Sequence, residues 1–230
     1  MGHLSDRLAA VRERALHAYS LRAGTGNGLR IVCVTKGRSL ASVEEVVQAG
    51  ALEIGENYLQ EALKKGVFRL RDQYGILVRF IGRIQSNKLS RVMREFDALD
   101  SLEERLLSEL APATLSGEVR IKEFLLEINA GGEQQKGGIT LERVRELFAG
   151  RKQPLPSFVS GFMAVVPLEA TMGERTALYE SVYEVFREVQ ERDASPAFTI
   201  LSMGTSDDYE LAITCGANMV RVGTALFGPR

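Results

Sequence analysis

Short apolar runs rich in β-branched residues alternate along the chain with stretches of helical periodicity. The first run, Arg30 to Lys36 (RIVCVTK), is nearly unbroken, which is typical of a parallel strand covered on both faces. Before it, Ser5 to Leu21 has apolar residues at helical spacing and predicts an amphipathic helix capped by Ser5. After it, Ser42-Val43-Glu44-Glu45 has the spacing of a capping box, and Gly50 predicts the end of that helix.

The same alternation continues to the end of the chain. Seven more segments are predicted strands: Ala51 to Ile54, Val78 to Ile81, Ala98-Leu99, Val119 to Ile128, Phe158 to Val165, Phe198 to Leu201 and Met219 to Val222. Helical patterns fill the intervals, including one that opens at the capping box Ser101-Leu102-Glu103-Glu104 and a long one over Glu169 to Glu191.

About eight parallel strands with intervening helices fit either a closed barrel or an open doubly wound sheet. The barrel is favoured because no Gly-x-Gly-x-x-Gly turn follows the first strand. The predicted fold class is therefore α/β: a single (β/α)8 TIM-type barrel with an extra N-terminal helix, spanning residues 1–230 as one domain.

Composition narrows the class of protein. Of 230 residues, 45% are hydrophobic and 26% charged, as in ordinary soluble globular proteins. The 29 basic and 30 acidic residues leave no basic excess for nucleic acid or a membrane surface. No apolar run approaches membrane-spanning length and the start lacks a secretory signal, so we expect a cytoplasmic protein. Two cysteines and two histidines are too few to favour a metal site or a histidine triad.

Functional groups of such folds collect at the carboxyl ends of the strands, and Lys36 follows the first one. An apolar surrounding lowers the pKa of a lysine and leaves a fraction of neutral amine, which can attack a carbonyl to form a Schiff base. The alternative is a solvated loop lysine without a chemical role.

A second signal follows the last two strands. The turn Ser202 to Asp208 and the pair Gly223-Thr224 are rich in small and hydroxyl residues, and barrels frequently bind phosphate with these two loops. The alternative is that Ser206 caps its helix, with Asp207 and Asp208 complementing the helix dipole. In a closed barrel the last strand pairs with the first, so a ligand carrying an aldehyde and a phosphate would span both signals. Pyridoxal 5′-phosphate (PLP) has these groups.

The chain also resembles the YggS/PROSC family of pyridoxal phosphate homeostasis proteins, whose fold is similar to the N-terminal barrel of alanine racemase. The matching blocks occur in order over nearly the whole chain: Val34-Thr35-Lys36, Ile54 to Glu61 (IGENYLQE), Phe80 to Lys88 (FIGRIQSNK), Ile128-Asn129 with Lys136 to Ile139 (KGGI), Gly161-Phe162-Met163, Leu201 to Asp208 (LSMGTSDD) and Met219 to Gly228 (MVRVGTALFG).

This resemblance implies roles for individual residues. Lys36 would hold PLP as a Schiff base, Arg221 would face the pyridine nitrogen, and the phosphate would be bound by Ser206, Gly223 and Thr224. The remaining cofactor-binding residues implied by the blocks are Asn57, Met163 and Ser202.

Other residues in and near the blocks have weaker assignments. Arg79 and Arg83 depart from the histidine and proline common at these positions. The stretch Gln85 to Lys88 starts a helix and has no chemical role of its own, and Tyr58 is either an acid/base or, the preferred interpretation, a packing aromatic. Cys33 and Cys215 are expected to pack, and both histidines are expected at the surface.

Three hypotheses for function remain. The preferred one is a monomeric PLP-binding protein that buffers PLP or delivers it to PLP-dependent apo-enzymes, without strong catalytic activity. A permanently charged arginine at the ring nitrogen disfavours the electron-sink chemistry of PLP enzymes, and the chain ends at Arg230 with no expected segment to supply a second acid/base. The alternatives are a single-domain amino-acid racemase or other Schiff-base enzyme using Lys36 with Tyr58 or water, and a phosphosugar barrel enzyme without PLP.

Overall fold

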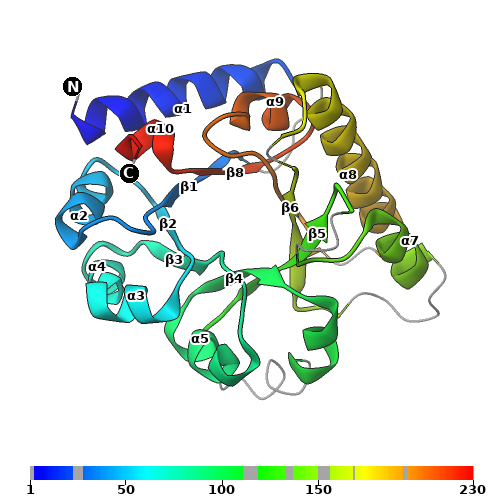
Figure 1. Cartoon of the computed structure of the whole chain (residues 1–230), viewed down its shortest axis with the longest axis horizontal. Helices are drawn as coiled ribbons and strands as arrows, with labels where there is room; N and C mark the ends of the chain where they lie inside the picture. Colours follow the sequence, from blue (N-terminus) through cyan, green and yellow to red (C-terminus); the bar gives the residue numbers. More distant parts are fainter. Residues whose placement is uncertain are drawn as a thin grey trace.

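Eight parallel strands form a closed barrel in sequence order, and β1 pairs with both β2 and β8 (Figure 1). The computed structural model describes residues 3–22, 28–110, 119–132, 137–149, 156–167, 169–193 and 196–229. The strands are β1 Arg30–Val34, β2 Glu53–Glu56, β3 Leu77–Phe80, β4 Ala98–Leu102, β5 Glu123–Asn129, β6 Val159–Val165, β7 Ile200–Ser202 and β8 Met219–Val222. The predicted closed barrel is confirmed.

Helices surround the barrel between successive strands (Figure 1). They are α1 Leu4–Ser20, α2 Leu40–Gln48, α3 Leu59–Lys65, α4 Val67–Tyr74, α5 Leu89–Glu95, α7 Leu141–Ala149, α8 Met172–Asp193, α9 Tyr209–Thr214 and α10 Thr224–Phe227, with short 3₁₀ helices η1 Ser86–Lys88 and η2 Glu104–Leu106. The extra N-terminal helix α1 is also confirmed, and it packs against α9, α10 and α2.

Two of the predicted helix starts are wrong by a few residues. His3, and not Ser5, is the N-cap of α1, and the Asp6 carboxylate accepts a hydrogen bond from the His3 amide at 3.2 Å. Ser39 caps α2 by accepting a hydrogen bond from the amide of Ser42, so Ser42 lies inside the first turn. At α2 the Ser39 side chain satisfies a free amide of the first turn, whereas at α1 the side chain of Asp6 in the first turn binds the amide of the N-cap residue. Local spacing alone does not say which of two nearby residues is the N-cap.

The capping box predicted at Ser101 is also wrong. Ser101 lies within β4, which extends to Leu102, and its buried hydroxyl donates a hydrogen bond to the carbonyl of Gly82. Pairing of β4 with β3 and β5 outweighs the local helix signal at Ser101, and the predicted helix through Leu110 begins only after β4, with the 3₁₀ turn η2 followed by helical residues 107–110. Among the other segments, β5 starts four residues later than predicted, at Glu123, and α8 starts at Met172.

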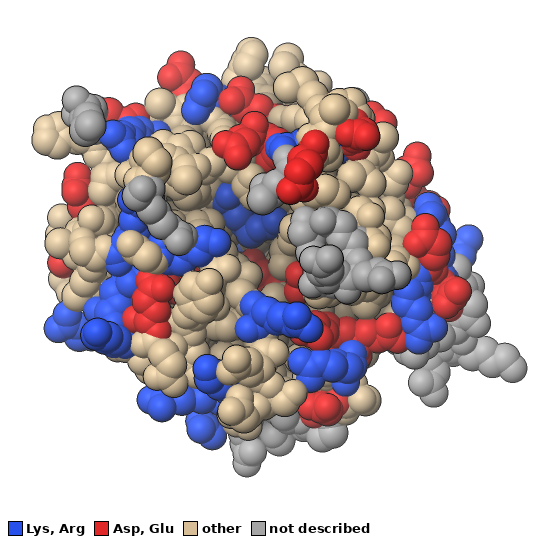
Figure 2. Space-filling model, in the orientation of Figure 1, with Lys and Arg blue, Asp and Glu red and all other residues tan. Residues whose placement is uncertain are grey.

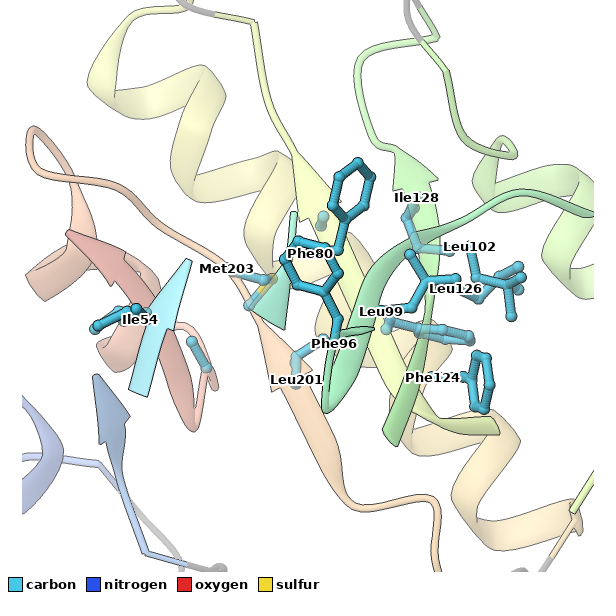
Figure 3. Close-up of a cluster of buried hydrophobic side chains, with 14 of the residues drawn as sticks. Ile54, Phe80, Phe96, Leu99, Leu102, Phe124, Leu126, Ile128, Leu201 and Met203 are labelled. Atoms are coloured by element: carbon cyan, nitrogen blue, oxygen red, sulfur yellow. The ribbon is translucent and has the colours of Figure 1, made fainter. Parts of the chain in front are cut away.

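The apolar core has two parts because strand side chains alternate between the inside and the outside of the barrel. Residues such as Ile54, Phe124 and Leu126 face outward and pack under the helices, as Figure 3 shows for part of this cluster. A smaller group fills the inside: Val32, Leu125, Met163, Ile200 and Met219.

A cluster of charged residues also lies inside the barrel. The fully buried Arg79 guanidinium lies 2.7 Å from the Asp100 carboxylate, 2.6 Å from that of Glu123 and 3.0 Å from that of Glu53. Arg30 bridges the same two glutamates, at 2.6 Å from Glu53 and 3.0 Å from Glu123. Burial alone would lower the pKa of Arg79, but the three carboxylates together raise it. Because Glu53, Glu123 and Arg30 begin their strands, this cluster belongs to the amino-terminal part of the barrel and leaves the opposite end for a ligand.

Candidate functional site

A cavity of about 360 Å³ opens where the strands end. Its volume falls within the range of roughly 300 to 1,000 Å³ that small-molecule sites occupy. Seven of the eight predicted cofactor-binding residues line it: Lys36, Asn57, Met163, Ser206, Arg221, Gly223 and Thr224. The space-filling view shows a hollow near the middle of this face with basic side chains inside it (Figure 2). The structure therefore brings the predicted site residues together.

Lys36 lies immediately after β1 and is half-buried. Apolar side chains of Val34, Ile81 and Val165 line the same cavity as Lys36. On its C-terminal side, the amide of Gly37 donates a hydrogen bond to the Glu61 carboxylate at 2.6 Å.

The residue before Lys36 is fixed by a buried polar group. The Thr35 hydroxyl donates to the Glu56 carboxylate at 2.6 Å, and the Lys65 ammonium donates to both the Thr35 carbonyl, at 2.8 Å, and Glu56, at 2.7 Å. Burial raises the pKa of Glu56, although Lys65 and Thr35 act against this shift. With anchors on both sides, the backbone that carries Lys36 is held in one position.

The loops after β7 and β8 meet at the Ser206 hydroxyl. Its oxygen accepts hydrogen bonds from the amides of Gly223, at 2.9 Å, and Ala225, at 3.1 Å. Ser206 does not cap the following helix, because α9 begins at Tyr209 after the N-cap Asp208. The alternative interpretation of Ser206 is thus wrong, and the hydroxyl lies beside the amides and the Thr224 side chain at the cavity wall.

The two aspartates that follow Ser206 differ in burial and in their contacts. The buried Asp208 carboxylate accepts hydrogen bonds from the Arg175 guanidinium at 2.8 Å, the Tyr179 hydroxyl at 2.9 Å and the Thr205 amide at 2.7 Å. These partners hold it in the loop and keep it out of the cavity lining, whereas the exposed Asp207 remains at the cavity.

Arg221 is buried at the cavity with its guanidinium fixed by carbonyl and hydroxyl acceptors. One nitrogen donates to the Ser202 carbonyl at 3.0 Å and to its hydroxyl at 2.7 Å, and the other donates to the Ala164 carbonyl at 2.9 Å. Burial lowers the pKa of Arg221, while nearby carboxylates, Asp100 first among them, oppose the shift. Ser202, the eighth predicted residue, is not among the lining residues and acts by orienting Arg221.

Asn57 is positioned by a close approach of two loops. A Cβ atom on Gly82 would lie 2.0 Å from the Asn57 carbonyl oxygen, so only glycine allows β3 to end against this backbone. Met163 is buried inside the barrel and forms part of the cavity floor.

Sequence reasoning missed Glu127 and Arg38, which also line the cavity. Glu127 lies in β5 and shares the inner face with Leu125 and Glu123. Burial raises the pKa of Glu127, and the negative charge of Glu103 adds to this effect, while Arg221 and Arg83 act against it. Two acidic residues on one face of a buried strand were the signal that could have identified it.

A second cavity, of about 680 Å³, adjoins the first and shares Asn57 with it. Gln85 and Lys88 line it at the predicted helix start, now seen as η1 followed by α5. Tyr58 lines it too and is 61% exposed, so the expectation of a packing aromatic is wrong. Tyr58 precedes the first turn of α3, where its ring points out of the core.

The remaining predictions concern cysteines, histidines and one lysine. Cys33 is buried and burial raises the pKa of its thiol to about 12, as expected for a packing residue, and Cys215 is half-buried. His3 and His17 are exposed, as predicted. Lys136 of the KGGI block lies outside the described residues.

Within the described part of the chain, no cluster of three or more His, Cys, Asp or Glu side chains is arranged to hold a metal ion. None of the described helices is long and apolar enough to cross a membrane.

The barrel and its cavity define a protein with the fold of the alanine racemase N-terminal domain, and the family model of that domain matches residues 9–230. An alanine racemase from Bartonella henselae superposes with a TM-score of 0.66 at 11% identity, covering 94% of this chain and 57% of that one, which supports the fold alone. The chain belongs to the family of pyridoxal phosphate homeostasis proteins. The proteins of this name from Aquifex aeolicus and Escherichia coli K12 are 34% and 29% identical to it, over 98% and 100% of this chain and 97% and 98% of theirs.

A solved structure extends the comparison. PipY of Synechococcus elongatus, in a structure described as having PLP bound, is 26% identical with a TM-score of 0.77, covering 98% of this chain and all of that one. The structure of PipY without PLP superposes with a TM-score of 0.82 over 98% of this chain and 100% of that chain.

Proposed function

We propose that this protein binds PLP in the cavity at the strand ends and serves intracellular PLP homeostasis. The observation that carries the proposal is the convergence of Lys36, Arg221 and the Ser206 loop contact on one cavity of about 360 Å³. Membership of a family whose relatives are named pyridoxal phosphate homeostasis proteins, and the PLP described in PipY, support it.

The residues fit the three polar parts of PLP. Lys36 provides an amine for the aldehyde, with which it forms a Schiff base and releases water. The Ser206 and Thr224 hydroxyls are donors for a phosphate, and the Gly223 amide, which donates to the Ser206 oxygen, holds the two loops together around it. Arg221 provides a fixed cation for the ring nitrogen, and Asn57 and Met163 provide contacts for the ring.

We further infer that the protein carries PLP and does not use it for strong catalysis. When bound in an enzyme, PLP supplies an electron sink, and the residue at the ring nitrogen tunes it. The Arg221 guanidinium has donors only, and its contacts with Ser202 and Ala164 fix it in place. It cannot accept a proton from the ring, which disfavours that chemistry. Delivery to apo-enzymes and the monomeric state stay predictions.

The test is a titration of the purified protein with PLP, followed by visible absorbance. The wild type should develop the band of a PLP Schiff base. Lys36→Ala should lose the band while retaining weak binding, because the phosphate donors remain. Lys64→Ala, in which the lost amine belongs to an exposed residue of α3, is the matched control and should behave as wild type. An unchanged band in Lys36→Ala would refute the assignment.

A further inference from the structure

Glu127 is a carboxylate in the candidate PLP cavity that the proposed function does not yet use. It lines the cavity together with Lys36 and Arg221. In the closed barrel β5, which carries Glu127, is four strands from β1 in either direction (Figure 1). The acid and the lysine amine therefore belong to opposite walls of one small chamber.

The surroundings of Glu127 are unusual for a carboxylate. Within the described part of the chain, neither a hydrogen bond nor an ion pair of its side chain is found, and the charges that act on it do so at longer range. Glu127 is half-buried at the cavity wall, and partly buried acids with a raised pKa that face a cavity are concentrated at functional sites. The charged residues that act on it or share its cavity are Glu103, Arg83, Arg221, Lys36, Arg38 and Asp207.

The segment that follows β5 leaves room around this carboxylate. A Cβ atom on Gly137 would lie 3.5 Å from a carboxylate oxygen of Glu127, so the glycine passes close over the acid without a side chain. The acid thus faces the cavity on one side and a glycine backbone on the other.

We propose that Glu127 is the acid/base residue that transfers the protons needed when PLP is attached to Lys36 and when it is released. This proposal rests on the proposed function, because it requires an aldehyde that reacts with Lys36. The protonated Glu127 carboxyl is the acid during attachment, and its carboxylate is the base during release.

Formation of the Schiff base needs one proton from an acid for the water that leaves. The neutral Lys36 amine adds to the aldehyde carbon: a C–N bond forms, the C=O double bond becomes a single bond, and one of the two amine protons moves to the oxygen to give a hydroxyl. Glu127 gives its proton to that hydroxyl, which leaves as water, and the nitrogen keeps its remaining hydrogen as a protonated Schiff base. The products are one water, one cationic nitrogen and one carboxylate, so atoms and charges balance. In release, the carboxylate takes a proton from the attacking water.

Because the same group serves both directions, its removal has a characteristic kinetic effect. A general acid/base typically accelerates its step by about 100-fold or more. Loss of the acid should slow attachment and release together, whereas loss of a structural contact would mainly weaken affinity.

The experiment measures attachment and release of PLP by stopped-flow absorbance in wild type and Glu127→Gln. Gln keeps the shape of the side chain and removes its proton exchange. We expect both rates to fall by about 100-fold. Since the raised pKa of Glu127 makes the acid form available nearer neutrality, the wild-type attachment rate should also decline as pH rises through that pKa, and this dependence should be absent in the variant.

Glu103→Gln is the matched control, since Glu103 acts on Glu127 and is not among the residues that line the cavity. Removing its negative charge should shift the pH dependence of attachment to lower pH and leave the maximum rate unchanged. If Glu127→Gln fails to fold, Glu127→Ala takes its place, and added formate should restore its rates.

The outcomes separate this proposal from the proposed function. Wild-type protein that forms no Schiff base would refute both. If the wild type forms the Schiff base and Glu127→Gln attaches and releases PLP at wild-type rates, the role proposed for Glu127 is refuted but the proposed function is not. A variant with changed affinity but an unchanged pH dependence, or Glu127→Ala without rescue by formate, would also overturn it.

Discussion

The charged cluster inside the barrel predicts a large loss of stability on removal of Arg79. In Arg79→Met, Arg30 is the one arginine left in this cluster, where it pairs with Glu53 and Glu123, and Asp100 loses its ion-pair partner, so the excess of negative charge within the cluster grows from one to two. Removing one partner of a buried ion pair typically costs about 3 to 5 kcal/mol, because the remaining charge is left uncompensated. For a chain of this size that corresponds to a fall in Tm of roughly 6 to 20 °C.

The pH dependence of this loss has a defined sign. Burial would raise the pKa of Glu123, but Arg79 and Arg30 lower it overall. A carboxyl with a lowered folded-state pKa contributes stability above its unfolded pKa, about 4.3, and loses it as the pH falls. Without Arg79 much of this contribution disappears, so wild type and Arg79→Met should differ most above about pH 5 and converge in more acidic solution.

Thermal and urea unfolding followed by circular dichroism measure both effects. Arg143→Met is the control, since Arg143 also contacts a carboxylate closely, at 2.6 Å from Glu104, but on the surface. Exposed ion pairs are screened by solvent and contribute little to stability, so this variant should unfold at nearly the same temperature and urea concentration as the wild type. An Arg79→Met protein as stable at pH 7 as Arg143→Met would refute the reasoning.

Two further predictions concern the binding loops. Ser206→Ala combined with Thr224→Ala should leave the Schiff base intact but speed the loss of PLP on dialysis, because each hydrogen bond to a charged phosphate contributes roughly 1.5 to 3 kcal/mol; equal retention would place the phosphate elsewhere. Gly82→Ala should unfold at lower temperature and bind PLP less tightly, because the added Cβ would meet the Asn57 carbonyl at 2.0 Å. Gly173→Ala, where the added Cβ would meet nothing within 4 Å apart from its chain neighbours and the backbone of its own helix, is its control and should be as stable as wild type or slightly more so.

The barrel could be predicted from sequence because several strands, such as β1 (RIVCV) and β6 (VSGFMAV), are short, largely apolar runs and helical patterns fill the intervals. Met219 to Val222, which contains Arg221, was predicted with its observed bounds, and Lys36 was placed just after the first strand. Ser101 shows the limit: its capping spacing is real, but pairing with strands distant in sequence decides its conformation.

The missed part of the site depends on contacts between distant segments. Glu127 belongs to no motif, and although its spacing from Glu123 marks the inner face of β5, its place in the same cavity as Lys36 follows only from the closed barrel. Likewise, the sequence alone does not decide whether Ser206 lines the cavity or caps a helix. The structure decides it, because the loop after β8 places the amides of Gly223 and Ala225 against the Ser206 hydroxyl.

The central claim is that Lys36 holds PLP covalently in this cavity. The most direct measurement is reduction of the PLP-loaded protein with borohydride, followed by proteolysis and mass spectrometry of the peptides. The account predicts a stable pyridoxyl adduct on Lys36 at close to one per chain. An adduct spread over exposed lysines such as Lys64, or located on another single lysine, would contradict it.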